Sequence, residues 1–362
     1  MKSEKTPLEV WEDSGSRSFY NSPHYAKFSE NQGNTITFLR IGEGASQVLL
    51  PVARPHVWTY WGKTIIPVPP PLAPTHSIYL GILLPGDYEG FSFSDLLEQT
   101  TRLKWSKLFP EFSFVQPVLI ESGPADFLEQ FCADIRESKL GHSDTHSRVL
   151  KMDPITAEIS LLSGIGLSDD ELHDATNFEN ILSGYASKRR YDIRRAQREG
   201  VTVTVSRVDS DEMARSIYSS IIDMHYESWT RTGLGPHTLQ YWIDLSKAVR
   251  DSGGNDLVCR AYDRDGEILA VTVVHVQGKS TFYQMNSSSL KGQKLSANPY
   301  CLHAAITASN FWGAEYFELG RSSVVASAKS KSISAYKNEF GGDSLPVPNF
   351  TSSTWKRKSS ND

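Results

Sequence analysis

The sequence predicts an α+β fold, and two patterns carry this prediction. Residues 201–205 alternate valine with threonine, which is the two-residue period of a half-buried strand. Residues 256–262 and 267–276 flank the turn sequence Asp-Arg-Asp-Gly, an arrangement typical of an antiparallel hairpin. Helical segments occur before, between and after these strands rather than in regular strand–helix alternation. We therefore expect mixed sheets flanked by helices.

The length of the chain predicts two domains. At 362 residues it is longer than a single hydrophobic core usually supports. The polar segment 141–147 is rich in turn-forming residues and marks a boundary near position 145. We accordingly predict an N-terminal domain over residues 1–144, a C-terminal domain over 145–350 and a polar tail over 351–362.

The composition excludes several classes of protein. Hydrophobic residues make up 39% of the chain and charged residues 22%, which is ordinary for a globular protein. A formal net charge of −5 argues against a general nucleic-acid coat, and DNA is not an expected partner, whereas a local contact with RNA stays open. No apolar run approaches the length of a transmembrane helix, and the N-terminus has no signal-peptide core. We expect a cytoplasmic protein, with a peripheral position at the inner membrane face left open.

Neither the cysteines nor the histidines predict a metal centre. Cys132, Cys259 and Cys301 are far apart, without metal-type spacing, and are expected to be small buried residues in a reducing compartment. The histidines are dispersed as well.

The first half of the chain reads as strands and helices around a proline-rich loop. Prolines at this density cannot lie in a central strand, because proline donates no ladder hydrogen bond. The predicted elements are a strand over 47–53, the loop over 66–74, a strand over 78–84, a helix over 93–108, a strand over 112–120 and a helix over 125–139.

The second half has clearer start and stop signals. Asp209 and Glu212 form a pair typical of a helix start, and Thr238 is expected to cap the next helix, which ends at a glycine pair. Besides the hairpin, the predicted elements are a strand over 148–152, a basic helix over 188–198, a strand over 201–205, helices over 209–229 and 238–254, a strand over 281–286, a helix over 299–312, a strand over 315–319, a serine-rich loop over 321–332 and a final segment over 333–342.

The basic helix reverses the sign of an acidic chain. In a helix, Arg190, Arg194 and Arg198 fall on one stripe, where their mutual repulsion costs stability unless an anion binds. Guanidinium groups match the geometry of phosphate, so we interpret this stripe, together with Lys188, as a phosphate-binding site. A solvated basic face is the alternative interpretation.

Five short motifs follow one another in the second half. They are KRRYDIRRA at 188–196 with Gly200-Val201 after it, FYQMNSS at 282–288, NPY at 298–300, FELGRS at 317–322 and YKNEFGG at 336–342. In this order they resemble the Fem-type acyltransferases of the GNAT superfamily, which include the peptidyltransferases that build peptidoglycan cross-bridges. The resemblance covers roughly residues 145–345 and implies tandem GNAT-like domains, of which the first is degenerate. Members that act on peptidoglycan often carry a coiled-coil arm, and no sustained heptads occur here.

The resemblance implies transfer of an acyl group to an amine. In a GNAT fold two neighbouring strands splay apart, and backbone N–H groups stabilise the oxyanion that forms during attack; we expect residues 270–275 and 281–286 to be this pair. The segment 290–296, at the place of the usual pyrophosphate loop, has a single glycine, which weakens the case for coenzyme A. Acyl-CoA and aminoacyl-tRNA both stay open as donors, and no tightly bound cofactor is expected. The expected acceptor is an amine of a sugar, of peptidoglycan or of another cell-envelope precursor, including nucleotide- or lipid-linked forms.

The resemblance places Lys337 at the reaction centre. As an ammonium it would hold a phosphate or polarise an oxyanion, and as a neutral amine it would accept a proton. A surface lysine near a helix end is the alternative interpretation. Arg321, which follows a glycine at a strand end, is expected to contact an anionic part of the substrate. Tyr283 and Asn286 are expected to line the acceptor cleft, and Glu318 is interpreted as structural.

Two classes of function follow from these observations. The first is an acyltransferase or aminoacyltransferase that acts on a cell-envelope precursor. The second is a non-catalytic protein that keeps the GNAT fold and binds an anionic ligand or RNA through its basic helix. The sequence does not decide the oligomeric state.

Overall fold

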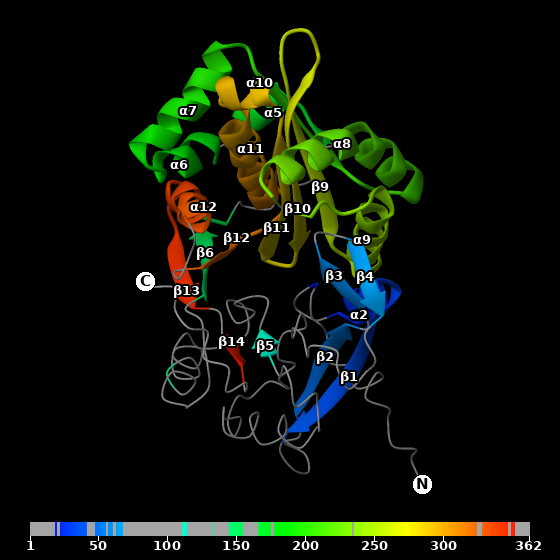
Figure 1. Cartoon of the computed structure of the whole chain (residues 1–362). Coiled ribbons are helices and arrows are strands. Elements are labelled where there is room, and N and C mark those ends of the chain that lie inside the picture. Colours follow the sequence, from blue (N-terminus) through cyan, green and yellow to red (C-terminus); the bar gives the residue numbers. More distant parts are fainter. Residues whose placement is uncertain are drawn as a thin grey trace.

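One mixed sheet of eight strands dominates the structure (Figure 1). The computed structural model describes residues 19, 22–41, 48–55, 57–60, 63–67, 111–113, 133, 145–154, 166–174, 177–233, 235–323, 328–346 and 349–351. The strand order is β13-β6-β12-β11-β10-β9-β8-β7, and within it β11 and β12 are parallel while the other neighbours are antiparallel. The predicted α+β class is confirmed. The strands are β6 (Thr145–Lys151), β7 (Gly166–Leu167), β8 (Thr202–Arg207), β9 (Asn255–Tyr262), β10 (Ile268–Gln277), β11 (Ser280–Ser288), β12 (Tyr316–Ser323) and β13 (Asp343–Pro346).

Helices cover both faces of this sheet. α11 lies across one face with α7 beside it, whereas α8 and α9 cover the other face (Figure 1). None of the helices in the described part of the chain is both long enough and apolar enough to cross a membrane. The helices of this half are α5 (Asp169–Asp174), α6 (Phe178–Ser183), α7 (Ser187–Arg198), α8 (Asp211–Arg231), α9 (Leu239–Asp251), α10 (Leu290–Lys294), α11 (Ala297–Phe311) and α12 (Ala328–Asn338).

Each face of the sheet has its own hydrophobic core. Alternate residues of β10 point to opposite faces, so Ala270 and Val274 enter the first core, on the α11 side. Val271 and Val273 enter the second core, where they meet aromatic residues of α8 and α9 such as Trp242. The sheet is therefore buried on both faces in its centre.

Short two-stranded pairs include all the strands described in the first half of the chain. β1 pairs with β2 and β3 with β4, while β5 pairs with β14, which follows the large sheet in sequence. Their bounds are β1 (Asn34–Ile41), β2 (Val48–Pro55), β3 (Val57–Tyr60), β4 (Lys63–Pro67), β5 (Glu111–Ser113) and β14 (Asn349–Thr351).

An N-terminal segment packs into the second core. Phe19 meets the ring of His275 edge-on, with 5.7 Å between ring centres. Phe28, in α2 (Pro23–Asn31), meets Tyr241 of α9 at 5.3 Å. The division of the chain at residues 144 and 145 stays a prediction, but the core on the α9 side includes residues from both sides of it.

The predicted elements of the second half are found, with some ends displaced. Thr238 caps α9 as predicted, because its hydroxyl accepts a hydrogen bond from the Tyr241 backbone N–H at 3.2 Å. The start of α8 was placed wrongly: Ser210 is the cap, whereas Asp209 pairs with Arg207 at 3.0 Å. The strand predicted over 315–319 continues to Ser323, because β6 supplies a further ladder partner.

In the first half, few predicted elements can be compared with the structure. The strand predicted over 47–53 corresponds to β2. The strand over 78–84 and the helix over 93–108 lie outside the described residues. The same holds for the proline-rich loop beyond β4, the strand over 112–120 beyond β5, and the helix over 125–139 apart from residue 133.

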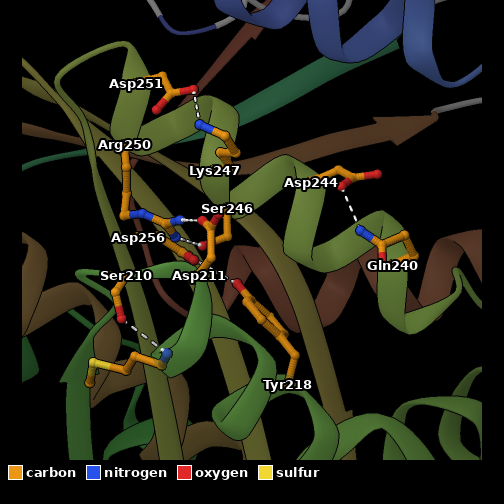
Figure 2. Close-up of polar contacts among 11 residues, drawn as sticks. Ser210, Asp211, Tyr218, Gln240, Asp244, Ser246, Lys247, Arg250, Asp251 and Asp256 are labelled. Carbon is orange, nitrogen blue, oxygen red and sulfur yellow. Dashed lines mark hydrogen bonds and ion pairs between the residues drawn. The ribbon is translucent and has the colours of Figure 1, made fainter.

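A buried carboxylate lies on the second-core side of the sheet. Asp256 of β9 is fully buried and accepts a hydrogen bond from the Tyr218 hydroxyl at 2.8 Å. Ser246 also hydrogen-bonds to it, and Arg250, which donates to Ser246, supplies positive charge nearby (Figure 2). His275 is 3.5 Å away, but burial lowers its pKa to about 3 and keeps the ring neutral. Burial also raises the pKa of Asp256 to about 6.

We expect Asp256→Asn to make the stability of the protein less dependent on pH. The carboxyl titrates near 3.8 when unfolded and near 6 when folded, so the wild type loses stability as the pH rises between these values. Relative to the variant, the wild type should lose on the order of 2–3 kcal/mol of unfolding free energy between about pH 4 and pH 7. Urea denaturation at each pH measures the difference in unfolding free energy between wild type and variant. A difference that stays constant over this pH interval would contradict the raised pKa of Asp256.

Candidate active site

The two parallel strands of the sheet separate part-way along their length. β11 pairs with β12 only where Ser280–Phe282 lie against Tyr316–Glu318, although both strands continue beyond these residues. The strands that the sequence analysis expected to splay, 270–275 and 281–286, instead pair along their length in β10 and β11. That prediction was wrong, because the turn at residues 278–279 joins β10 and β11 as an antiparallel hairpin. The separation lies instead between β11 and β12, which are connected in the sequence through α11.

Both strands are irregular directly after their last paired residues. In β11 the register with β10 shifts so that Gln284 is an extra residue, and such a bulge bends a strand and increases its twist. In β12 the register with β6 shifts between Glu318 and Arg321. Gly320 lies within this shift and has a φ of +74°, which residues with a Cβ atom rarely adopt. The irregularities bend the strands where they part.

Lys337 lies at this separation. It belongs to the last turn of α12 and is half-buried. Its Nζ atom is 6.0 Å from the centre of the Tyr283 ring on β11, and 3.5 Å from where a Cβ atom on Gly320 of β12 would lie. The amine is therefore close to both strands. Burial lowers the pKa of Lys337 to about 8, and the Glu318 carboxylate opposes this shift.

Of the two residues predicted to line a cleft, Tyr283 lies near Lys337 and Asn286 lies near Tyr283. The side-chain amide of Asn286 interacts with the hydroxyl groups of Tyr283 and of Tyr336, the residue before Lys337. These contacts are looser than regular hydrogen bonds. Burial raises the pKa of both phenols, so both hydroxyls stay protonated and can donate. The structure thus brings Lys337, Tyr283 and Asn286 into one site, and their roles in catalysis stay predictions.

The basic helix contributes a residue that the sequence analysis missed. Arg189 is 4% exposed and forms ion pairs with Glu339, just after α12, and with Asp192. Its guanidinium group lies 4.4 Å from the centre of the Tyr336 ring. Arg189 is four residues before the buried Ile193, and this helical spacing was the signal that could have placed it on the buried face.

The predicted arginine stripe lies on another face of α7. Arg190 donates to backbone carbonyl groups in the segment before the helix. Arg194 is exposed and 3.4 Å from Glu179, and Arg198 lies over the exposed Tyr191 ring at 5.7 Å. These contacts do not bring the stripe to Lys337, so its role in phosphate binding stays a prediction about a separate surface.

Lys188 and Arg321 occupy different positions relative to this site. The Nζ atom of Lys188 is 3.0 Å from the carboxylate of Glu339, two residues after Lys337. The backbone of Arg321 pairs with Ser147 in the ladder between β12 and β6. Its side chain is outside the part of the structure that is described, so the predicted anion contact stays a prediction.

The segment at the place of a pyrophosphate loop uses its polar groups internally. The backbone N–H of Gly292 donates to the Ser289 hydroxyl at 3.0 Å. A Cβ atom on Gly292 would lie 2.1 Å from the Leu269 carbonyl oxygen, so the glycine allows α10 to pack closely on β10. Lys291 is paired with carboxylates of the hairpin turn, with Glu267 at 2.7 Å.

The described residues contain no cluster of histidine, cysteine, aspartate and glutamate that could hold a metal ion. Cys259 and Cys301 are buried and free, and burial raises the pKa of each thiol. Neither sulfur is therefore set up as a thiolate nucleophile.

Comparison with known protein families assigns this half of the chain. The profile of the family described as "Acetyltransferase (GNAT) domain" matches residues 187–338, which run from α7 to α12. This part of the chain is a GNAT acetyltransferase domain. The protein is accordingly a transferase, and its reaction requires an acyl donor and an amine acceptor. A search of curated protein sequences finds no significant match.

One solved structure shares the fold over nearly the whole chain. The crystal structure of FemX matches with a TM-score of 0.59 and 12% identity, over 97% of each chain. The resemblance to Fem-type GNAT proteins is thereby confirmed at the level of the fold. Weaker matches are the C-terminal domain of a putative lysylphosphatidylglycerol synthetase from Agrobacterium fabrum (TM-score 0.47, 14% identity, 96% of this chain and 92% of that chain) and a tandem GNAT protein from the clavulanic acid biosynthesis pathway (TM-score 0.45, 10% identity, 95% and 94%).

We expect Arg189→Met to destabilise the GNAT domain by about 2–3 kcal/mol, because it breaks a buried ion pair while Lys188 still neutralises Glu339. The matched control is Arg198→Met on the exposed face of the same helix, which should change stability by less than about 0.5 kcal/mol. Urea denaturation of both variants measures the contrast. Equal effects at the two positions would show that the burial of Arg189 does not matter.

Proposed function

We propose that the GNAT domain transfers an acyl group to an amine, and that the ammonium group of Lys337 stabilises the negative charge that develops on the acyl oxygen. The observation that supports this proposal is the position of Lys337 where β11 and β12 separate. A fixed cation in a partly water-excluded site stabilises a developing oxyanion more strongly than water does. With a pKa of about 8, Lys337 is mostly protonated at neutral pH.

The proposed step conserves atoms and charge. The lone pair of the neutral acceptor amine attacks the carbonyl carbon of the donor, and the carbonyl oxygen takes up the negative charge. Lys337 faces that oxygen, and the hydroxyl groups of Tyr283 and Tyr336 are neutral donors nearby. When the double bond re-forms, the bond to the leaving group breaks and the proton lost by nitrogen goes to the leaving group. The products are an amide and a carrier with a free hydroxyl or thiol group.

The proposed donor is an aminoacyl ester of tRNA, and acyl-CoA is the alternative. Lys291 and the backbone N–H of Gly292 are engaged within the protein, which leaves fewer groups for the pyrophosphate of coenzyme A. The exposed face of α7 carries Arg194, Arg198 and the Tyr191 ring, which is 58% exposed, and cations beside an exposed aromatic ring suit a nucleic-acid backbone and its bases. The likeness to Fem-type peptidyltransferases supports the same donor.

The proposed acceptor is an amine of a sugar, of peptidoglycan or of another cell-envelope precursor that is linked to a nucleotide or a lipid. This part of the proposal rests on the resemblance of the five sequence motifs to Fem-type proteins. A cytoplasmic location belongs to the same proposal, because such precursors are assembled there.

We expect Lys337→Met to lower kcat by about 10²–10³-fold, the usual loss when one oxyanion-stabilising group is removed. In the wild type, kcat should fall as the pH rises through about 8, because the protonated lysine is the active form. The mass of the acceptor amine, followed over time, measures both effects. Unchanged turnover in the variant would remove Lys337 from the mechanism, and a rate that rises through this pH would make the lysine a proton acceptor instead.

The donor is tested by the salt dependence of tRNA binding. The double variant Arg194→Ala/Arg198→Ala should bind tRNA more weakly. The slope of log affinity against log salt should become shallower by about 1–2, because binding with fewer phosphate contacts releases fewer counterions from the tRNA. Arg207→Ala, which removes a partly exposed arginine on β8, is the matched control and should leave the slope unchanged. If the protein transfers an acyl group from acyl-CoA and the double variant binds tRNA as the wild type does, acyl-CoA replaces aminoacyl-tRNA as the donor.

A further inference from the structure

The start of α7 packs against the end of α12 through backbone and side-chain contacts. The backbone N–H of Ala186, just before α7, donates to the Glu339 carbonyl group at 2.9 Å, and Arg189 pairs with the Glu339 carboxylate. A Cβ atom on Gly341 would lie 3.0 Å from the Gly184 carbonyl oxygen, so the two segments approach closely there. The end of α12 is therefore fixed to α7 at more than one point.

Arg189 is buried between carboxylates and aromatic rings. It is 4% exposed, and its Nη1 atom lies 3.3 Å from the carboxylate of Asp192. Its guanidinium carbon lies 4.4 Å from the centre of the Tyr336 ring and 5.0 Å from the centre of the Phe340 ring. The face of an aromatic ring attracts a cation, most strongly where water is excluded. One planar group thus contacts both a carboxylate and two rings at the end of α12.

The residues that Arg189 contacts lie on one side of the last turn of α12. Positions 336, 339 and 340 have the i, i+3, i+4 spacing of a single helix face. The backbone keeps turning up to Phe340, whose N–H donates to the Lys337 carbonyl group at 3.1 Å. Successive residues of a helix point about 100° apart, so fixing this face also fixes the direction in which Lys337 leaves the helix.

A second arginine contacts the same turn from the sheet. Arg148 of β6 donates to the Asn338 side chain and to the Gly342 carbonyl group, each at 2.6 Å. Asn338 is two residues after Tyr336, so it points about 200° further round the helix, on nearly the opposite side. Lys337 is the residue between them. Rotation of the turn about its axis would break the contacts of both arginines.

We propose that Arg189 is a positioning residue for the transfer reaction, which holds Tyr336 and Glu339 so that the amine of Lys337 faces the gap between β11 and β12. The inference rests on the proposed function, because it concerns the residue that carries that function. Arg189 acts through the last turn of α12. The helix whose exposed face carries the predicted phosphate-binding stripe thus has a second role on its buried face.

The shape of arginine explains why this position takes an arginine and not another cation. A guanidinium group is planar, so it lies flat on a ring while its N–H groups bond carboxylates at its edge. A lysine is a point charge on a flexible stem, and it cannot make both kinds of contact in the same fixed geometry. Arg189→Lys therefore keeps the charge and removes the orientation.

Turnover of Arg189→Lys tests the proposal. We expect kcat to fall by about 10–100-fold, because displacing a catalytic group by about 1 Å costs up to about 10²-fold. The KM for each substrate should stay within about twofold, because the lost interaction acts on the transition state and not on substrate binding. The mass of the acceptor amine, followed over time with aminoacyl-tRNA and with acyl-CoA as donors, gives both constants. An unchanged kcat would overturn the proposal.

Direct titration of Lys337 gives a readout that a merely structural role would not move. Full-length protein with isotope-labelled lysine is titrated by NMR, and the signal is assigned by its absence in Lys337→Met. In Arg189→Lys the pKa of Lys337 should rise from about 8 towards 10.5, because a loosened turn exposes the ammonium group to water while the nearby charge is kept. A fall in kcat with an unmoved pKa would overturn the proposal, because Arg189 would then act without displacing the lysine.

The matched control is Arg215→Met. It removes an exposed arginine of α8, on the opposite face of the sheet from α7. Both kcat and the titration of Lys337 should stay as in the wild type. Equal changes in this control and in Arg189→Lys would overturn the proposal, because the effect would then not depend on the contacts with α12.

A second variant covers the case in which Arg189→Lys fails to fold. Glu339→Ala breaks the same ion pair from the side of α12 and leaves the Tyr336 ring in place. It should lower kcat by at least about fivefold with little change in KM, because the turn that carries Lys337 loses one of its fixed contacts. A wild-type kcat in Glu339→Ala would overturn the proposal.

The titration separates this inference from the proposed function. If the wild type transfers an acyl group from neither donor, the proposed function fails, while the pKa of Lys337 in Arg189→Lys still decides whether Arg189 positions the lysine. If the wild type is active and Arg189→Lys loses stability with kcat and the lysine pKa unchanged, the role of Arg189 is structural and the inference fails alone.

Discussion

The candidate site depends on the incomplete pairing of β11 with β12. Parallel neighbours in a buried sheet normally satisfy each other's backbone groups, but here the pairing ends after Phe282 and Glu318. Each strand keeps its other neighbour, β10 or β6, so the sheet remains continuous while a gap opens between them. The bulge at Gln284 and the positive φ of Gly320 turn the strands apart, and the amine of Lys337 lies at van der Waals distance from the position of a Cβ atom on that glycine.

The position of the lysine in this gap depends on how the end of α12 is held. Arg189 on α7 forms an ion pair with Glu339, and Arg148 on β6 donates a hydrogen bond to the side chain of Asn338. A buried ion pair contributes little net stability, because both charges lose their hydration. Its directional contacts nevertheless fix where the helix ends. Packing of Arg189 on the Tyr336 ring, next to Lys337, adds to the same orientation.

Local sequence patterns predicted the second half well and the site only in part. The alternation at 201–205, the turn before Glu267 and the Thr238 cap are short-range signals, and they became β8, the β9–β10 hairpin and the start of α9. Lys337, Tyr283 and Asn286 were grouped through motif resemblance. The contact between Ser147 and Glu318 joins residues far apart in the sequence, and the separation of β11 from β12 depends on the strand order of the finished sheet. Neither has a local signature. The arginine stripe was predicted from charge spacing alone. The buried face of α7 is instead the one that contains Ile193, and Arg189 lies on that face.

The docking of α2 on α9 has a consequence for how the chain is made and handled. The residues that leave the ribosome early find their partner surface only after α9 has been synthesised, so this part of the interior closes late. A recombinant fragment that starts at β6 would lack Phe19 and Phe28 and would expose the apolar residues of the second core that they contact, together with the ring of His275. Anyone isolating the catalytic half should therefore retain the amino-terminal helix or supply it as a separate peptide.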